Sequence, residues 1–300
     1  MSTDVLHRRL AQSVLFVVAI IWGCAFVTQR TAMQDLGPFA FNGTRFFLAA
    51  LMLWAIVAYR GSLKLIDRSD WYFGVLLGGL LFAGASFQQV GVVTTSAGKA
   101  GFITGLYVVF IPLFLRICWR QLTSFGVWCG IFAALLGLFL LSISEQLTFQ
   151  RGDLWVTLCA IAFAWHMILT GRWVEHKDPW LLAAIQFSVI AVVSLFTAAF
   201  QENITFEGLY SAGPEILYAG ILSAGVGYTA QTVAQKYTSS VIVGIILSLE
   251  SVFAALAGWL LLHELLTARQ QLGCALMLAG TILAQLAQES PQKVADANRS

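Results

Sequence analysis

Residues 84–113 read GASFQQVGVVTTSAGKAGFITGLYVVFIPL, and residues 227–256, at an offset of 143, read GYTAQTVAQKYTSSVIVGIILSLESVFAAL. The two stretches share small and polar residues at the same places, including Gly84 with Gly227, Gln88 with Gln231, Thr95 with Thr238, Ser96 with Ser239, and Gly101 with Gly244. The same offset later aligns Gly130 with Gly273 and Gly137 with Gly280. Because shared hydrophobicity does not align Gly, Gln and Thr, we infer that the chain is a duplication.

The composition excludes an ordinary soluble domain. Of the 300 residues, 59% are hydrophobic and only 11% are charged, whereas about 25% charged is typical of soluble domains, and the mean hydropathy is +0.80. We therefore expect a lipid bilayer to surround most of the chain. The net charge of +2 indicates no nucleic-acid partner. Five cysteines without a CxxC pair predict neither a disulfide framework nor a metal site.

The sequence predicts ten membrane-spanning helices, since each span needs about 20 apolar residues. The predicted spans are residues 10–29, 38–59, 70–90, 97–117, 124–142, 153–171, 180–200, 213–235, 240–262 and 270–287. We therefore predict an all-α integral membrane protein. A first five-helix repeat covers residues 1–143, a second covers 144–287, and 288–300 form a loose cytoplasmic tail.

The distribution of Lys and Arg predicts the orientation, because cytoplasmic connectors carry an excess of both. With the N-terminus in the cytoplasm, the inner segments hold twelve: Arg8, Arg9, Arg60, Lys64, Arg68, Arg116, Arg120, Arg172, Lys177, Lys236, Lys293 and Arg299. The outer connectors hold only Arg30, Arg151 and Arg269. Both termini are therefore expected in the cytoplasm. Since five spans are an odd number, the second copy should be inverted relative to the first, as in many secondary transporters.

Several short motifs recur in the order expected for one family. They are Trp22-Gly23 with Phe26, Arg45-Phe46, Thr95-Ser96-Ala97-Gly98, Leu249-Glu250 with Val252-Phe253-Ala254, and His263-Glu264-Leu265-Leu266-Thr267 before Gly273 and Gly280. Together they resemble the drug/metabolite transporter superfamily, specifically its ten-helix members with two EamA-type repeats. The resemblance implies a carrier of small organic solutes, often an exporter, in the plasma membrane, here most simply a bacterial inner membrane. One departure is Ser251, where such repeats often carry Pro after the Glu.

Glu250 is the first candidate site residue, because it lies about ten residues into the ninth span. A carboxyl group at that depth costs several kcal/mol unless it is paired, neutral or in a wet cavity. It could exchange protons, which leaves protons open as a coupling ion, or it could pair with Arg45. The structural alternative is a protonated Glu250 that donates a hydrogen bond to a neighbouring helix. Its repeat equivalent is Tyr107, and Pro112 predicts a kink near Val108.

The amides Gln88 and Gln231 occupy equivalent repeat positions, and Tyr228 shares a helix face with Gln231. These side chains could line a solute cavity, or they could serve as hydrogen-bonding glue between helices. Trp22 and His166 add an aromatic wall and a second proton-coupling candidate. Arg45 could hold an anionic solute group, or it could snorkel to the headgroups as Lys99 could.

Other classes fit less well. An intramembrane enzyme is the alternative from another class, but His263-Glu264 starts the zinc-protease pattern and Thr267 stands where its second His is required. We therefore predict no enzyme, no catalytic residues, no cofactor and no bound metal. No Walker motif is present, so we expect no ATP-driven pumping. Within carriers, the alternative is a sugar-phosphate or nucleotide-sugar exchanger, which needs cationic residues facing the cavity in both halves.

Overall fold

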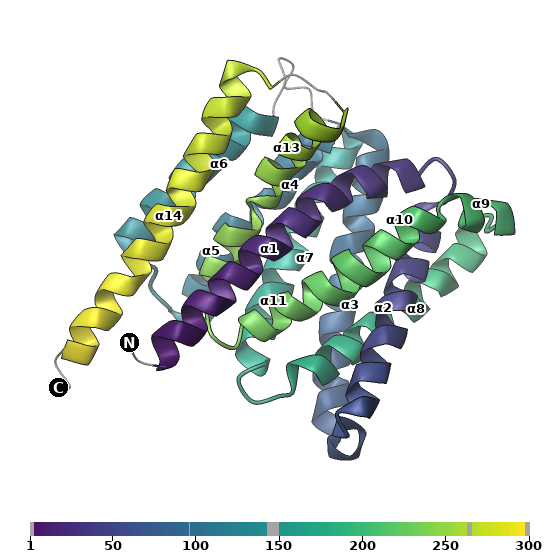
Figure 1. Cartoon of the computed structure of the whole chain (residues 1–300), viewed down its shortest axis with the longest axis horizontal. Helices are drawn as coiled ribbons and strands as arrows, with labels where there is room; N and C mark the ends of the chain where they lie inside the picture. Colours follow the sequence, from purple (N-terminus) through teal and green to yellow (C-terminus); the bar gives the residue numbers. More distant parts are fainter. Residues whose placement is uncertain (1–2, 96, 143–149, 263–265, 298–300) are drawn as a thin grey trace.

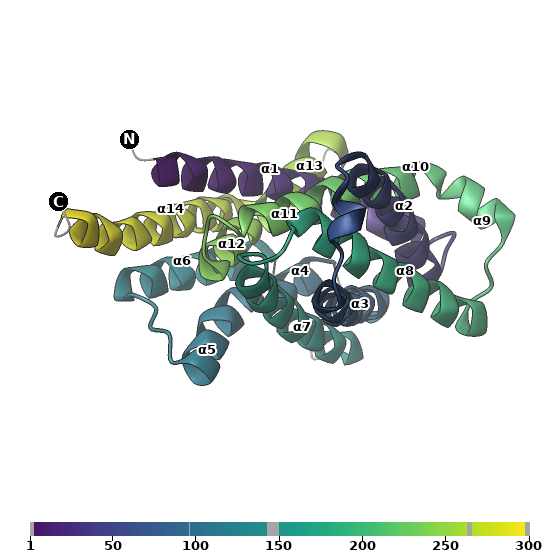
Figure 2. The same ribbon diagram turned by 90° about the horizontal axis from the view of Figure 1, so that it is seen from below.

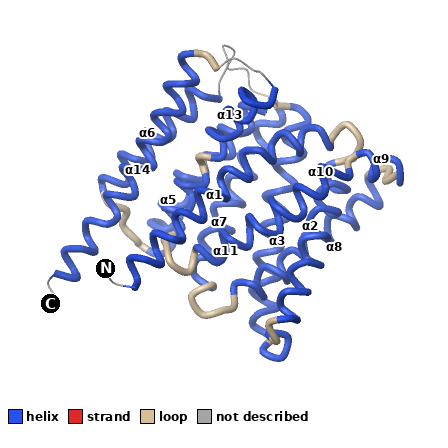
Figure 3. The backbone as a smooth tube through the Cα atoms, in the orientation of Figure 1, coloured by secondary structure: helices blue, strands red, loops and turns tan. Residues whose placement is uncertain are grey.

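The structure is a computed structural model that describes residues 3–95, 97–142, 150–262 and 266–297. Over these residues the chain is helical throughout, with short turns and loops as connections and no strand (Figure 3). Among the residues named above, Ser96, His263 to Leu265 and Arg299 lie outside the described part. The side chains of Phe26, Arg30, Ala97, Gly98, Lys99 and Lys293 are also not described.

The helices of the first copy follow the predicted spans closely. They are α1 (Thr3–Ala32), α2 (Pro38–Tyr59), η1 (Ser62–Leu65), α3 (Arg68–Thr94), α4 (Ala97–Gly105), α5 (Tyr107–Trp119) and α6 (Phe125–Ser142). The fourth predicted span is therefore two helices, α4 and α5. Both ends of the chain lie at one end of the bundle, which we call the N/C side; the opposite end is the far side (Figures 1 and 2).

The second copy contains α7 (Arg151–Trp173), α8 (Pro179–Gln201), α9 (Phe206–Ser211), α10 (Gly213–Leu217), η2 (Tyr218–Tyr228), α11 (Thr229–Ala234), α12 (Ser240–Leu247), α13 (Glu250–Leu262) and α14 (Ala268–Ala297). The sequence predicts a loose tail after Ala287, whereas in the structure α14 continues as a helix to Ala297. Residues 288–297 are rich in polar residues, so hydropathy alone separates these ten positions from the apolar span before them.

Nine helical segments in the described part of the chain are long and apolar enough to cross a membrane. The predicted span at 213–235 is divided among α10, η2 and α11, each of which is shorter than a single span requires. The helix η2 is a π-helix, an unusual form that occurs frequently at functional sites. The prediction of an all-α membrane protein is confirmed, and the number of ten spans stays a prediction.

The repeat-related helices α2 and α8 pack against each other in opposite directions. At one end of the pair, the Glu202 carboxylate accepts hydrogen bonds from the backbone N–H groups of Phe39 and Ala40, at 2.9 and 2.8 Å. At the other end, the Trp54 indole donates to the Ser188 hydroxyl at 2.8 Å. Residue numbers rise along α2 as they fall along α8, so this pair is antiparallel.

The helices α6 and α14 form the second antiparallel pair, along one edge of the bundle (Figures 1 and 2). A Cβ atom on Gly130 would lie 2.6 Å from the Gly280 carbonyl oxygen, and one on Gly137 would lie 2.5 Å from that of Gly273. Gly130 with Gly273 and Gly137 with Gly280 are repeat equivalents, so the pairing is reciprocal. Glycine is needed here because the two backbones touch, as in other close membrane-helix contacts. Two antiparallel pairs of equivalent helices make the copies inverted.

The outer surface is apolar, as a bilayer requires. Large side chains such as Phe132 and Phe196 are 70% and 66% exposed, while Arg45, Asn42 and Gln231 are buried inside the bundle. Lipid replaces water around this surface, so polar groups collect in the interior.

Candidate functional site

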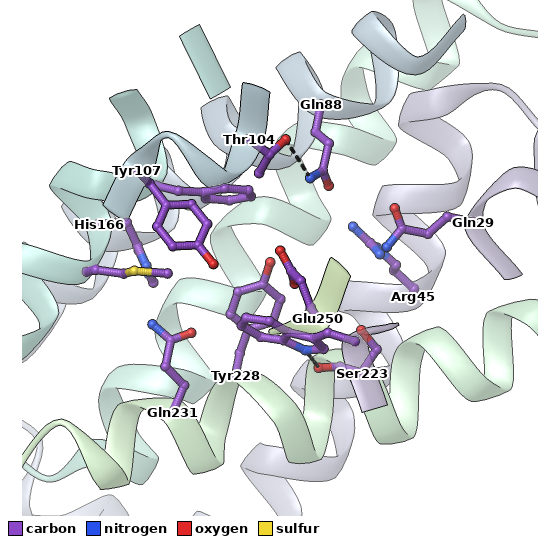
Figure 4. Close-up of a pocket in the computed structure, with 13 residues that line it drawn as sticks. Gln29, Arg45, Gln88, Thr104, Tyr107, His166, Ser223, Tyr228, Gln231 and Glu250 are labelled. Atoms are coloured by element: carbon purple, nitrogen blue, oxygen red, sulfur yellow. Dashed lines mark hydrogen bonds between the residues drawn. The ribbon is translucent and has the colours of Figure 1, made fainter. Parts of the chain in front are cut away.

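A polar cavity lies between the two copies, with a volume of about 40 Å³ (Figure 4). A water molecule needs about 10–15 Å³ by this measure, so the cavity holds about three waters and must widen to admit an organic solute. Its lining residues are Trp22, Gln29, Arg45, Gln88, Thr104, Tyr107, Phe163, His166, Met167, Ser223, Tyr228, Gln231 and Glu250. All eight candidate residues from the sequence are among them. The structure thus brings these residues together, and their role in binding is taken up as a proposal below.

Two interrupted helices meet at the cavity. One breaks at Leu106, between α4 and α5, and the other at Ser248 and Leu249, between α12 and α13. Leu106 and Leu249 are repeat equivalents, and the residue that follows each, Tyr107 or Glu250, begins the second half of its helix. Discontinuous helices of this kind surround the binding sites of many transporters.

The kink predicted near Val108 from Pro112 is therefore misplaced. The break lies at Leu106, six residues before the proline, where the Leu106 N–H turns to the Ile103 carbonyl, three residues back. The second copy breaks at the equivalent Leu249, although its counterpart of Pro112 is Ala255. The break is thus a property of the repeat, and a single proline does not account for it.

Aromatic side chains from each copy pack over a repeat-related glycine of the other. Trp22 lies against Gly227, where a Cβ would come within 2.5 Å of the indole nitrogen, and Phe163 packs directly on Gly84. The Trp22 indole donates to the Ser223 carbonyl at 3.0 Å, and its ring centroid lies 4.6 Å from that of Tyr228. These contacts explain why glycine recurs at the equivalent positions Gly84 and Gly227. They also place an aromatic wall on the cavity.

Two groups of opposite charge face the cavity. Arg45 is 3% exposed, and its guanidinium lies over the Phe41 and Phe46 rings, 5.2 and 4.9 Å from their centroids. Glu250 is 8% exposed, and the hydroxyl groups of Tyr107 and Tyr228 are directed toward it (Figure 4). In the described part of the chain Arg45 and Glu250 form no ion pair, and Arg45 Nε has no hydrogen-bond partner. Of the three readings of Arg45 given above, pairing with Glu250 and snorkelling to the headgroups are not observed in the structure.

The equivalent amides Gln88 and Gln231 have different neighbours. The Gln88 amide donates to the Thr104 hydroxyl across a long 3.4 Å contact within the first copy. Gln231 donates to Gln235 Oε1 at 3.1 Å, and its own oxygen has no partner among the described residues. Both side chains keep hydrogen-bonding capacity for another molecule.

His166 is held at the inner wall of the cavity. Its Nε2 lies 2.8 Å from Gln186 Oε1 on α8, and the imidazole is 2% exposed. Since the amide oxygen can only accept, Nε2 carries the proton in this contact. The neutral tautomer then leaves Nδ1 as an acceptor. Trp165, its neighbour in the sequence, stacks on Phe114 with ring centroids 5.1 Å apart and does not line the cavity.

A cluster of hydrogen bonds closes the bundle between the cavity and the N/C side. The Gln235 amide donates to the Met167 carbonyl at 2.7 Å, and the Ser240 hydroxyl donates to the same oxygen at 3.1 Å. Gly171 allows the approach, since a Cβ there would lie 2.5 Å from Ser240 Oγ. We call Met167, Gln235 and Ser240 the N/C-side clasp. Toward the far side the cavity reaches Gln29, near the end of α1.

Sequence reasoning missed several lining residues. Gln29 is an amide in an apolar helix, the same signal that identified Gln88, and it was overlooked because it lies at the edge of its predicted span. Ser223 contributes through its backbone carbonyl, for which a sequence offers no signal. Phe163 and Met167 are ordinary core residues by type.

Inverted helical copies around a shared polar cavity define the class of membrane transporters. The model of the EamA-like transporter family matches the chain at residues 9–143 and 150–286. The chain therefore belongs to this family and to the drug/metabolite transporter superfamily, with two EamA repeats.

Its relatives carry transporter names. An uncharacterized transporter of Archaeoglobus fulgidus is 32% identical over 279 residues, which cover 93% of this chain and 87% of the relative. The uncharacterized transporter YoaV of Bacillus subtilis is 24% identical, over 89% of this chain and 93% of its own length. The WAT1-related protein At3g02690, chloroplastic, of Arabidopsis thaliana is 24% identical, over 91% and 69%. The first two names describe transporters, and membership of the transporter family indicates a small-molecule solute.

The fold has been solved in a related chain. One protein crystal structure superposes with a TM-score of 0.80 at 18% identity, covering 94% of this chain and 98% of that one. At this identity the likeness concerns the fold alone.

Proposed function

We propose that the chain is a secondary transporter that exports small organic solutes, such as metabolites, amino acids or drug-like compounds, by alternating access. The observation that carries this proposal is the cavity lined by both copies at their two equivalent helix breaks. In such a design the solute stays near the membrane midplane while the halves rock around it. The cavity volume of about 40 Å³ fits a contracted state that must expand to bind.

Alternating access requires each side of the cavity to close in turn, and the two sides differ in the residues available to close them. The N/C side is closed by the clasp. At the offset of 143, the counterparts of Met167, Gln235 and Ser240 in the first copy are Cys24, Val92 and Ala97. We infer that Cys24 and Val92 close the far side in the other state, through apolar contact in place of hydrogen bonds.

The orientation is part of the proposal. We place the protein in a bacterial inner membrane with both termini in the cytoplasm, because Lys and Arg concentrate on the N/C side. Single cysteines at the exposed positions Gln34 and Glu207 should react with an impermeant thiol reagent from outside the cell, and those at Lys64 and His176 should not. The reverse pattern would overturn the orientation, and mixed reactivity within one pair would overturn the inverted ten-span topology.

Transport is tested in everted membrane vesicles with a panel of radiolabelled amino acids, organic cations and organic anions, with and without a proton gradient. Accumulation of a solute by vesicles that contain the protein, and not by empty-vector vesicles, is the expected result. Absence of accumulation and of exchange across the panel in both vesicle orientations would overturn the proposal.

Proton coupling is tested by Glu250→Gln, which keeps the shape of the side chain and removes its titration. Arg45, Tyr107, His166 and Tyr228 share its cavity and are unchanged in this variant. If Glu250 carries the coupling proton, the variant should lose gradient-driven accumulation and keep passive exchange. Full gradient-driven accumulation in Glu250→Gln would exclude this role.

The exchanger alternative receives no support from the cavity. A sugar phosphate needs cationic partners in both halves, whereas Arg45 is the one permanent cation among the described lining residues, and the second copy contributes Glu250. A carboxylate beside the site would repel a phosphate group.

A further inference from the structure

The two ionisable end groups of the cavity, Arg45 and Glu250, are both buried and both without a charged partner. Arg45 and Glu250 are 3% and 8% exposed, and neither takes part in an ion pair in the described chain. A guanidinium stays charged in any protein environment, and removing it from water without a counter-charge is costly. The two Phe rings beside Arg45 offset part of that cost through cation–π contact. They do not occupy its hydrogen-bond donors.

The surroundings of the two groups favour a separation of charge across the cavity. Figure 4 shows the Arg45 guanidinium beside Gln29, with Glu250 facing it from the opposite wall. Glu250 is the first residue of α13, and the positive end of a helix dipole favours a negative charge at that position. The positive end and the negative end of the site thus lie on different copies of the repeat.

Three buried polar atoms of the lining have no hydrogen-bond partner in the described part of the chain. They are Arg45 Nε, the Tyr107 hydroxyl and Gln231 Oε1. Buried polar groups in folded proteins are almost always paired. Arg45 Nε offers a donor at one end of the cavity, and the Tyr107 hydroxyl and Gln231 Oε1 offer acceptors at the other end. This pattern complements a ligand that has an anionic group and a cationic group.

We propose that the cavity takes a zwitterionic solute, with a carboxylate bound by Arg45, an ammonium group bound by Glu250, and an apolar part against Trp22 and Tyr228. This inference rests on the proposed function and names the substrate class of the same site. The guanidinium fork matches a carboxylate with two parallel hydrogen bonds. The Trp22 and Tyr228 rings, 4.6 Å apart, give the apolar part a wall.

The net charge of the loaded site distinguishes a zwitterionic solute from an organic anion or an organic cation. A bound ammonium group favours the ionised form of Glu250, so a zwitterion pairs with both groups and the loaded site is neutral overall. An organic anion pairs with Arg45 but leaves Glu250 alone and repels it. An organic cation pairs with Glu250 and leaves Arg45 alone. In a low-dielectric site each unpaired charge weakens binding strongly.

Binding to the purified full-length protein tests the proposal without requiring transport. The first set of probes is L-phenylalanine, its amide, which carries only the positive charge, and 3-phenylpropanoate, which carries only the negative charge. L-leucine with its amide and 4-methylpentanoate form a second set. A hydrogen bond to a charged group is worth about 1.5–3 kcal/mol, and 1.4 kcal/mol is tenfold in affinity. We therefore expect at least one zwitterion to bind about tenfold or more tightly than both of its single-charge analogues.

Two substitutions separate binding from structural damage. Arg45→Gln should remove the preference for the amino acid over its amide, and Glu250→Gln should remove the preference over the analogue without an amino group. A misfolded variant loses all binding and does not exchange one preference for another. Glu207→Gln, which removes a carboxyl group at an exposed position outside the cavity, is the matched control and should keep both preferences.

Equal affinity of a single-charge analogue, unchanged preferences in Arg45→Gln and Glu250→Gln, or no binding of either zwitterion would each overturn the inference. Transport of a solute with one charge only would overturn it while leaving the proposed function intact. Zwitterion binding without transport of any solute would support the inference and overturn the proposed function.

Discussion

Replacing Gln235 by Val should open the N/C side of the cavity. Val is the residue at the equivalent position of the first copy, Val92, so the change makes the two closures alike. It removes the hydrogen bond from Gln235 to the Met167 carbonyl on α7 at 2.7 Å and the longer one to the Ser240 hydroxyl on α12 at 3.4 Å. It also removes the contact from Gln231 to Gln235 at 3.1 Å, which lies one turn apart along the same helix. Hydrogen bonds between membrane helices average about 0.6 kcal/mol each. Two of them amount to about 1.2 kcal/mol, which is roughly eightfold in the ratio of open to closed molecules.

The assay measures access to the cavity from each side. A cysteine replaces Ser223, a lining residue, in a background without the five native cysteines, none of which forms a disulfide. The protein is reconstituted in liposomes with determined orientation, and a charged thiosulfonate reagent is added on one side at a time. Labelling from the N/C side should become several-fold faster in Gln235→Val, with the far-side rate unchanged or lower.

A matched control removes a hydrogen bond that lies away from the cavity. The exposed Thr197 hydroxyl donates to the Val193 carbonyl at 2.8 Å on the lipid-facing side of α8, and Thr197→Val should leave both labelling rates as they were. An unchanged N/C-side rate in Gln235→Val would show that the clasp does not control access. Faster labelling from both sides would indicate general loosening and would equally refute the reasoning.

Three further outcomes follow from the packing and the charges. Gly137→Ala should lower the melting temperature in detergent, by an overpacking cost of about 1–3 kcal/mol, because its Cβ meets backbone atoms of α14; Gly79→Ala, where nothing lies within 4 Å, should not. Glu202→Ala should cost about 1 kcal/mol, measured by the same melting assay, through loss of the cap on α2; no change would contradict that role. Hydrogen bonds from Ser69 and from Lys177 hold the pKa of Asp67 below its usual value. The stability this adds is present above about pH 4 and is lost as the pH falls further, so Asp67→Asn should flatten the melting profile in that acid range.

Much of the architecture could be predicted because a bilayer imposes simple rules. The predicted span at 38–59 coincides with α2, and the reciprocal contacts of Gly130 and Gly137 follow directly from the repeat. Polar residues in apolar spans were a sound guide to the cavity, since lipid cannot satisfy Gln88 or Gln231 and both must turn inward.

What the sequence did not reveal depends on packing between distant segments. The π-helix η2 places Gly220 against the backbone of α2 near Arg45 and Gly225 against Met52, and neither contact leaves a local pattern. The helix breaks were traced to Pro112 because proline is the one local signal of a break. Leu106 and Leu249 look like ordinary span residues, so only their structural equivalence identifies them as the break points.

The divergence between the copies has an energetic consequence for transport. In a protein with identical inverted copies, the two access states would have equal free energy. Here Gln235 and Ser240 close the N/C side through hydrogen bonds. Their counterparts in the first copy are Val92 and Ala97, whose side chains cannot form such bonds. The empty protein should therefore rest with its N/C side closed. A solute can move that equilibrium only by as much as its affinities for the two states differ. If the termini are cytoplasmic, an exported solute must stabilise the state in which the clasp is broken. About 1.2 kcal/mol is enough to offset two such bonds, which a single charged contact with Arg45 or Glu250 can supply.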